Sequence, residues 1–195
     1  MKQISFISFV FCSLAFSDVS DGITLFTIND PEYRTYLIDN DQEIINTWQH
    51  TTSSASMPYL LPDSTLLFPG RVQDPSYMEV SSAGGKLIKY NWSGQIIWEY
   101  VFADSMYIQH HDIEPLPNGN VLLLAYERIS MQDGVNAGKT NLEGEIWSEM
   151  IVEIEPQGFN EGNIVWEWHF WDHLIQEVDP AKENYGIISQ NPQRL

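Results

Sequence analysis

The chain has 195 residues and combines twenty-seven Asp and Glu with only nine Lys and Arg, which gives a formal charge of -18 at pH 7. A chain of roughly 150 residues already buries about two-thirds of its unfolded surface, so this length is sufficient for a real core. Composition excludes nucleic acid as a partner, because phosphate backbones are bound by clustered Lys and Arg and the sequence has no such cluster. The acidity also repels anionic substrates, except at a locally basic or His-lined pocket.

The first seventeen residues have the pattern of a secretory signal peptide. Lys2 provides a basic start, the stretch 4–16 is apolar apart from Ser, and small residues at 15 and 17 precede an acidic segment. The apolar run is too short to span a bilayer as a mature helix. We therefore predict cleavage after Ser17 and export to the periplasm or the medium, with no membrane span in the mature chain; a buried N-terminal strand is the alternative. The single cysteine, Cys12, lies in this run, so the mature chain is predicted to have no thiol and no disulfide.

Two sequence elements recur along the chain. The first is a pair of β-branched runs joined by a polar turn and followed by Trp, and its copies lie at 36–48, 86–100 and 150–168. The second, at 59–68 and 113–124, includes the turn sequence Pro-Asn-Gly in its second copy. Both patterns are typical of β-hairpins. The Gly- and Asn-rich stretch from Met131 to Glu145 is predicted to be an insertion in the third interval.

Two hairpins make a four-stranded unit that repeats at about fifty residues, within the range of propeller blades. The predicted fold is therefore all-β, a β-propeller of four-stranded blades, with about three blades in this sequence. Closed propellers have about four to eight blades, so we expect residues 18–195 to be the N-terminal blades of a longer, truncated protein. The Trp residues that end each first element are expected to pack between blades. A half ring could in principle close by dimerising, but the sequence gives no basis for an oligomeric state.

Four of the five histidines lie in two short blocks, 110–111 and 169–173, next to repeat strands. In a propeller, the segment that enters the innermost strand faces the central channel. Alternation along an extended strand points His110 and His111 to opposite faces and places Asp112 on the face of His110. We therefore predict that His111 is the reactive residue. A structural hydrogen-bond pair of His and Asp is the alternative interpretation.

The sequence lacks the full motifs of other common functional sites. His, His and Asp can ligate zinc, but their spacing across separate repeats matches no zinc motif, so no metal and no cofactor is predicted. Asp39, Asp41 and Glu43 resemble part of a calcium loop that lacks the Gly and the distal Glu, and we interpret them as a solvated turn. The sequence contains no serine nucleophile elbow, phosphate-binding glycine loop or cysteine pair.

Two blocks carry a resemblance to a known family. Residues 109–125 read QHHDIEPLPNGNVLLLA and residues 165–176 read VWEWHFWDHLIQ. Both resemble the bacterial arylsulfotransferase family, and the likeness extends over most of the mature chain. The resemblance implies a six-bladed propeller that moves a sulfuryl group from an aryl sulfate donor to a phenolic acceptor. It also implies that no nucleotide sulfate is used and that a sulfurylated histidine is the intermediate.

The resemblance also assigns site residues. His111 matches the first His-Asp motif of the family and His173 its Trp-Asp-His motif, so both are predicted to be active-site histidines. The later blades of the family contribute further histidines and an arginine, and the sulfur-accepting histidine is expected beyond residue 195. Positive or histidine side chains would stabilise the sulfonate oxygens during transfer. The substrate-binding candidates are His110 and Asp112 together with Arg71 and Arg128, which each follow the second hairpin of a unit; a surface charge without a role is the alternative for the two arginines.

Two rival functions remain open. One is a noncatalytic propeller that binds a ligand or a protein at the channel mouth, since a fold does not specify one function. The other is a quinone-dependent dehydrogenase-like propeller, which shares the Trp-bearing repeats. The sequence does not distinguish which phenols are donor and acceptor, or whether the protein is released or held at the cell envelope.

Overall fold

A computed structural model describes residues 21–29, 31–73 and 83–194. These residues form antiparallel strands with one short α-helix and two 3-10 helices, so the predicted all-β class is confirmed. The closed ring of a propeller stays a prediction. The predicted signal peptide, residues 1–17, lies outside the described residues, and so does Cys12. Within the described ranges, no helix is long and apolar enough to cross a membrane.

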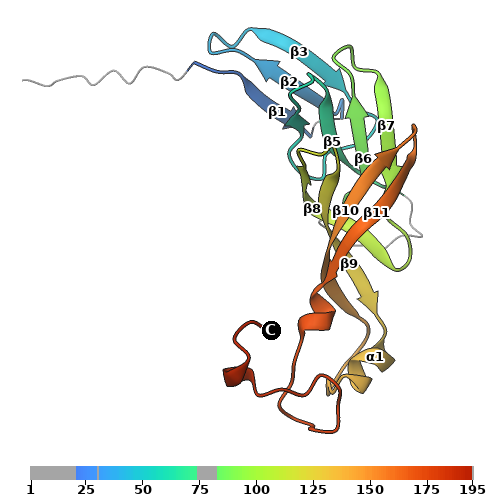
Figure 1. Cartoon of the computed structure of the whole chain (residues 1–195). Coiled ribbons are helices and arrows are strands. Elements are labelled where there is room, and N and C mark those ends of the chain that lie inside the picture. Colours follow the sequence, from blue (N-terminus) through green and yellow to red (C-terminus); the bar gives the residue numbers. More distant parts are fainter. Residues whose placement is uncertain (1–20, 30, 74–82, 195) are drawn as a thin grey trace, which may run out of the picture.

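The strands form three sheets in chain order, and sheet 2 lies between sheets 1 and 3 (Figure 1). Sheet 1 contains β1 (Thr24–Ile28), β2 (Arg34–Ile38) and β3 (Ile44–Gln49). Sheet 2 contains β4 (Tyr59–Leu60), β5 (Leu66–Arg71), β6 (Gly85–Tyr90) and β7 (Ile96–Val101). Sheet 3 contains β8 (Tyr107–Pro115), β9 (Val121–Ile129), β10 (Ile146–Gln157) and β11 (Glu161–His169).

The two repeated sequence elements fold as the predicted hairpins. The first element forms β2–β3, β6–β7 and β10–β11, and the second forms β4–β5 and β8–β9. Each copy of the first element has a register shift that leaves one extra residue in the outer strand: Ile45, Ile97 or Val165. The bulge therefore lies at the equivalent position of the three hairpins.

The Asp39–Glu43 segment is the turn between β2 and β3. The Asp39 Oδ1 atom accepts hydrogen bonds from the backbone N–H of Asp41 and of Glu43, each at 2.9 Å. Asn91 does the same for Gln95 N–H in the turn between β6 and β7 (2.9 Å). A short polar side chain at this position therefore closes the turn, and the interpretation of residues 39–43 as a turn is confirmed.

Apolar layers join neighbouring sheets. Successive residues of β5 point to opposite faces, so Leu66 and Phe68 face sheet 1 while Leu67 faces sheet 3. Full burial of such a side chain stabilises the folded chain by about 1.5–3 kcal/mol. The layer between sheets 1 and 2 also contains Leu37, Trp48, Ile88 and Tyr90. The layer between sheets 2 and 3 also contains Leu87, Trp98, Phe102, Ile113, Leu123, Val152 and Ile154.

Two buried tryptophans each connect one sheet to a hairpin of the next sheet by a hydrogen bond. Trp48 Nε1 of sheet 1 donates to the Asn91 carbonyl of sheet 2 (3.0 Å), and Trp98 Nε1 of sheet 2 donates to the Glu161 carbonyl of sheet 3 (2.9 Å). Both side chains are buried. The predicted packing of Trp between repeats is confirmed for these two residues. Trp166, on the outer strand of sheet 3, is 46% exposed.

Gln109 makes a second connection between sheets 2 and 3. Its Oε1 accepts the Gly85 N–H (2.8 Å) and its carbonyl accepts the Gly84 N–H (2.8 Å). The side chain is fully buried. A Cβ atom on Gly84 would lie 2.0 Å from Gln109 Oε1, so only glycine fits there. These contacts position the next residue, His110, at the edge of sheet 3.

The predicted insertion at 131–145 connects β9 to β10. It begins with α1 (Met131–Asn136), whose N-cap Ser130 accepts a hydrogen bond from Asp133 N–H. After β11 the chain continues through η1 (Phe170–His173) and η2 (Ile188–Gln190). Asn184 Nδ2 donates to the Ala137 carbonyl (2.9 Å), so this last segment contacts the end of α1.

Replacing Trp98 with Ala should destabilise the fold strongly, because it opens a cavity between sheets 2 and 3 and removes the bond to Glu161. We expect a loss of about 3–5 kcal/mol in the free energy of unfolding, measured by urea denaturation. Trp147→Ala is the matched control, since that indole is 42% exposed, and it should cost less than about 1 kcal/mol. Equal losses in the two variants would contradict the proposed role of Trp98.

Candidate functional site

The strand that carries the paired histidines is interrupted at that point. The register between β8 and β9 shifts between Gln109 and Ile113, and His111 has a φ of 51°. This is a left-handed conformation, uncommon for residues other than glycine. His110 is buried and His111 is exposed. The bulge therefore places one imidazole inside the sheet edge and presents the other to solvent.

The prediction that His110 and His111 point to opposite faces is wrong. The two Nδ1 atoms lie 2.7 Å apart, and the rings meet edge to face. Simple alternation requires a regular extended strand, and the left-handed residue breaks that regularity. The two rings instead form a hydrogen-bonded pair.

His110 is held by three neighbours. Its Nε2 lies 2.7 Å from Glu149 Oε2, its Nδ1 contacts His111, and its ring stacks on Tyr126 with centroids 3.8 Å apart. Tyr126 on β9 and Glu149 on β10 are directly paired in the register, so both belong to one face of sheet 3. Burial lowers the pKa of His110 and outweighs the opposite effect of the Glu149 carboxylate. The ring is therefore neutral near pH 7.

The hydrogen-bond network assigns the tautomers of both rings. An ionised carboxylate only accepts hydrogen bonds, so His110 Nε2 donates to Glu149. The Nδ1 atom of the neutral His110 ring then accepts from His111 Nδ1–H. In the neutral form of the His111 ring, this tautomer leaves the lone pair on Nε2. The chain Glu149–His110–His111 thus orients the Nε2 side of an exposed imidazole toward solvent-accessible chemistry.

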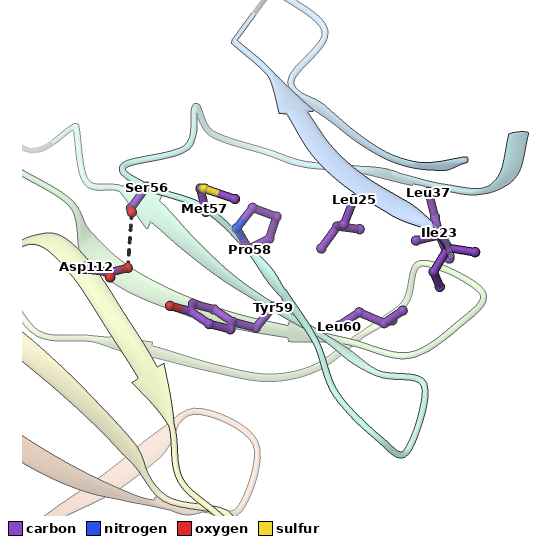
Figure 2. A pocket seen from close by; sticks show the side chains of 9 residues that line it. All are labelled: Ile23, Leu25, Leu37, Ser56, Met57, Pro58, Tyr59, Leu60 and Asp112. Atoms are coloured by element: carbon purple, nitrogen blue, oxygen red, sulfur yellow. Dashed lines mark hydrogen bonds between the residues drawn. The ribbon is translucent and has the colours of Figure 1, made fainter. Parts of the chain in front are cut away.

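Asp112 belongs to a different environment. It accepts a hydrogen bond from Ser56 Oγ (3.3 Å) and lines a hollow of about 400 Å³ between sheets 1 and 2 (Figure 2). The expectation that Asp112 shares the face of His110 is therefore wrong, again because of the bulge. The rest of the lining is mainly apolar: Ile23, Leu25, Leu37, Met57, Pro58, Tyr59 and Leu60.

The polar end of this hollow includes a tyrosine hydroxyl. In Figure 2 the Tyr59 hydroxyl points toward Asp112. Burial raises the pKa of Tyr59, and the carboxylates of Asp112 and Glu114 raise it further. The phenol is therefore protonated at neutral pH. The hollow combines an apolar wall with the hydroxyls of Ser56 and Tyr59 and one carboxylate, which suits a neutral aromatic molecule with a hydroxyl group better than an anion.

A second histidine–carboxylate pair lies on the other face of sheet 3. His169 Nδ1 on β11 lies 2.7 Å from Glu127 Oε2 on β9, and its Nε2 lies 3.6 Å from Glu167 Oε1. Burial works to lower the pKa of His169, but the hydrogen bond and charge of Glu127, with help from Glu167, raise it overall. Because Glu127 and Tyr126 are adjacent on one strand, the His169 pair and the His110 pair occupy opposite faces.

The remaining predicted site residues are spread along the chain. His173 lies in η1 and stacks on Trp168, with ring centroids 4.6 Å apart. Arg71 ends β5 and donates from Nη1 to the Ala83 carbonyl (2.9 Å). Arg128 near the end of β9 has Nε 3.2 Å from Glu145 Oε2, an ion-pair contact whose N–H direction makes no hydrogen bond. Their roles in binding a sulfonate stay predictions.

The sequence analysis missed Glu149, Tyr126 and Glu127, which orient the imidazoles of His110 and His169. A signal was present, because these polar side chains interrupt β-strands that are otherwise rich in Leu, Ile and Val. A half-buried carboxylate in such a strand needs a hydrogen-bonding partner. Among the residues that the structure describes, no group of three His, Cys, Asp or Glu side chains is arranged to hold a metal ion.

Comparison with known protein families identifies the family of this chain. A family model described as Arylsulfotransferase (ASST) matches residues 14–192. The chain belongs to the arylsulfotransferase family. This match confirms the resemblance carried by the two histidine blocks, and the family implies small-molecule aryl sulfates and phenols as substrates. A search of curated proteins gave no significant match.

The His169–Glu127 pair predicts a specific pH dependence of stability. The pKa of His169 is raised in the folded chain above its ordinary value of 6.5. The stabilisation by this pair is therefore complete below the unfolded pKa and is lost as the pH rises through the folded pKa. Glu127→Gln should lower the free energy of unfolding more at about pH 5.5 than at about pH 8.5.

The measurement is urea denaturation of wild type and variant at both pH values. Glu153→Gln is the control, because Glu153 bonds to Asn118 and Asn120, and its effect should be the same at both pH values. A larger effect of Glu127→Gln at the alkaline pH would contradict the raised pKa.

Proposed function

We propose that this member of the arylsulfotransferase family is an exported, nucleotide-independent enzyme that transfers a sulfuryl group from an aryl sulfate to a phenol through a sulfurylated histidine. The single observation that carries the proposal is the chain Glu149–His110–His111, which leaves a lone pair on an exposed imidazole nitrogen. The proposed architecture is a six-bladed propeller, of which the three described sheets are successive blades.

His111 acts as the base of the acceptor half-reaction. His111 Nε2 takes the proton of the phenolic hydroxyl, while the phenol oxygen attacks the sulfur of the sulfohistidine. The new O–S bond forms as the N–S bond breaks, and the electron pair of that bond returns to the imidazole nitrogen. The products are an aryl sulfate, a neutral imidazole on the nucleophile and a protonated His111. The Glu149 carboxylate stabilises this positive charge through His110.

The sulfur-accepting histidine is assigned to no residue of this sequence, in keeping with its expected position beyond residue 195. In the first half-reaction that imidazole attacks the sulfur of the donor and the donor leaves as a phenolate, which regains a proton. His173 serves as a second active-site histidine, and Arg71 and Arg128 serve as sulfonate contacts. Neither half-reaction requires a cofactor in this proposal.

The hollow beside Asp112 binds the aromatic ring of the acceptor. Its wall of Leu25, Leu37 and Leu60 offers apolar contact to this ring. A sulfate ester would be repelled by the Asp112 carboxylate, so the hollow selects the neutral acceptor over the anionic donor.

Replacing His111 with Asn tests the catalytic role. Asn tolerates the left-handed conformation of this position, so the bulge should be retained. The test uses the protein extended beyond residue 195, which includes the expected later blades. In it, turnover of p-nitrophenyl sulfate with phenol as acceptor, followed by release of p-nitrophenolate, should fall by about 10²–10⁴-fold. Ser64→Asn is the matched control, because Ser64 is exposed and has a φ of 61°. No turnover by the extended wild-type protein, or full turnover by its His111→Asn variant, would refute the proposal.

Glu149→Gln tests whether turnover depends on the assigned tautomers of His110 and His111. The amide of Gln can donate to His110 Nε2, which reverses the hydrogen-bond chain and places a proton on His111 Nε2. We expect turnover to fall by about 10²–10⁴-fold with little change in stability, and ¹⁵N NMR of the histidine rings to show His111 Nε2 protonated. Glu153→Gln, on the same strand, should behave as wild type in both measurements. An unaltered His111 nitrogen spectrum in Glu149→Gln would contradict the assigned tautomers.

Noncatalytic binding is the second candidate function, and the apolar hollow favours it. In this case phenol binds with the same affinity to wild type and to His111→Asn, and neither protein turns over aryl sulfate. Calorimetric titration with phenol, with Met57→Asp as the variant that charges the wall of the hollow, separates this function from catalysis.

A further inference from the structure

We propose that Trp147 binds the aromatic ring of the aryl sulfate donor, beside Arg128, which binds the sulfate group. The inference rests on the proposed sulfotransferase function and assigns a site to its anionic substrate, which the hollow beside Asp112 repels. The position of Trp147 in sheet 3, its ring contacts and the charge of its neighbour support this role.

Trp147 lies on a part of sheet 3 that extends past the end of sheet 2. Counted from the bulges of the hairpins, the pair Tyr126–Glu149 corresponds to the last pair between β5 and β6. Strands β9 and β10 continue for three more pairs, and one of these is Arg128–Trp147. This extension runs away from the other sheets toward α1 (Figure 1). A following blade of the length of sheet 2 would leave the extension uncovered, so the site is compatible with a six-bladed ring.

A row of aromatic rings connects the extension to the histidine pair. The centroids of the Trp147 and Tyr126 rings are 6.2 Å apart, and Tyr126 stacks on His110 at 3.8 Å. The His110 and His111 rings meet at 5.0 Å. Side chains two residues apart on a strand project from the same face, about 7 Å apart. A benzene ring that stacks on Trp147 therefore lies on the face of sheet 3 that carries His110, next to the proposed base His111.

The Trp147 indole is available for stacking. It is 42% exposed, whereas the indoles of Trp48 and Trp98 are buried and hydrogen-bonded. Among the described residues, Tyr126 is its only ring contact and Nε1 has no hydrogen-bond partner. Aromatic pairs in stacked or edge-to-face geometry stabilise a complex beyond the area that they bury. The indole thus offers a flat apolar surface to an aryl group.

Arg128 supplies the positive charge that a sulfate ester requires. It pairs directly with Trp147 across β9 and β10, so the guanidinium and the indole lie on one face. In the part of the chain that the structure describes, its side chain has one partner, the Glu145 carboxylate, 3.2 Å from a buried Nε that makes no hydrogen bond. A guanidinium binds oxyanions through parallel N–H groups. Arg128 can therefore exchange Glu145 for the oxygens of a sulfate.

The two sites separate the two substrates by charge. The hollow combines apolar side chains with the Asp112 carboxylate, which favours a neutral phenol. The extension combines an indole with a guanidinium, which favours an aromatic anion. Both sites adjoin the histidine pair, because Asp112 follows His111 in the chain and Tyr126 connects His110 to Trp147. In a double displacement the donor leaves before the acceptor reacts, so the two sites act in turn.

Steady-state kinetics of the protein extended beyond residue 195 test this role. In a ping-pong reaction, kcat/KM for each substrate reports its own half-reaction. Trp147→Leu should lower kcat/KM for p-nitrophenyl sulfate by roughly 3–10-fold and leave kcat/KM for phenol unchanged. Trp147→Phe keeps an aromatic ring and should retain most of the wild-type value. The loss in Trp147→Leu should be larger for naphthyl sulfate than for phenyl sulfate, because the larger ring system covers more of the indole.

Trp92→Leu is the matched control, because Trp92 is 43% exposed and lies in the turn between β6 and β7. This variant should behave as wild type with both substrates. Equal losses for donor and acceptor in Trp147→Leu, or no loss for either, would overturn the donor site.

Binding of phenylmethanesulfonate separates failure of the donor site from failure of the proposed function. In this analogue a carbon replaces the ester oxygen, so no sulfuryl transfer occurs. Calorimetric titration of the extended protein should show a dissociation constant raised roughly 3–10-fold in Trp147→Leu and roughly 10-fold or more in Arg128→Gln. Glu145→Gln should bind the analogue more tightly, because Gln no longer competes for Arg128.

The outcomes are distinct. Wild-type turnover together with unchanged analogue affinity in Trp147→Leu would refute the donor site alone. The expected changes in affinity without any turnover by the extended wild-type protein would refute the sulfotransferase and retain a site for aromatic sulfonates.

Discussion

The burial of apolar faces between successive sheets is the interaction on which the rest of this structure depends. Each sheet is apolar on both sides, so none of them is stable until a neighbour covers it. The indole N–H of Trp48 and Trp98 then fixes how each sheet meets the next hairpin, since it must reach a backbone carbonyl of the turn. Apolar contact provides the free energy, and the directional bond selects the relative position.

The site follows from this packing. Gln109 joins sheet 2 to β8 through its buried amide, and the register shift of β8 begins directly after this residue. The bulge turns His110 onto Tyr126 and Glu149, which neighbouring strands present on one face. His111 consequently reaches solvent, and its contact with the buried His110 ring sets its orientation. A reactive imidazole on a rigid sheet edge loses less entropy on reaching the transition state than one on a mobile loop.

The overall charge of the chain has the same sign as the proposed sulfate ester substrate. The chain as a whole is strongly acidic, yet the proposed reaction handles an anionic sulfate ester. The acidic side chains near the site are largely engaged: Glu149 with His110, Glu127 with His169 and Asp112 with Ser56. Carboxylates held by hydrogen-bond donors repel an anion less than free ones do, and the mainly apolar hollow beside Asp112 is offered to the neutral acceptor.

The sequence by itself determined the all-β class, the hairpin repeats, the interlocking Trp residues and the family. These properties are local or periodic. The alternation of apolar residues, the turn residues and the repeat spacing can all be recognised in the sequence itself. Only the tertiary structure decided that His110 and His111 form a bonded pair, that Asp112 lies in a hollow apart from them, and that Glu149 is their partner. The reason is that a bulge changes side-chain direction through one left-handed residue, and a cross-strand partner forty residues away is set by register, which no local pattern encodes.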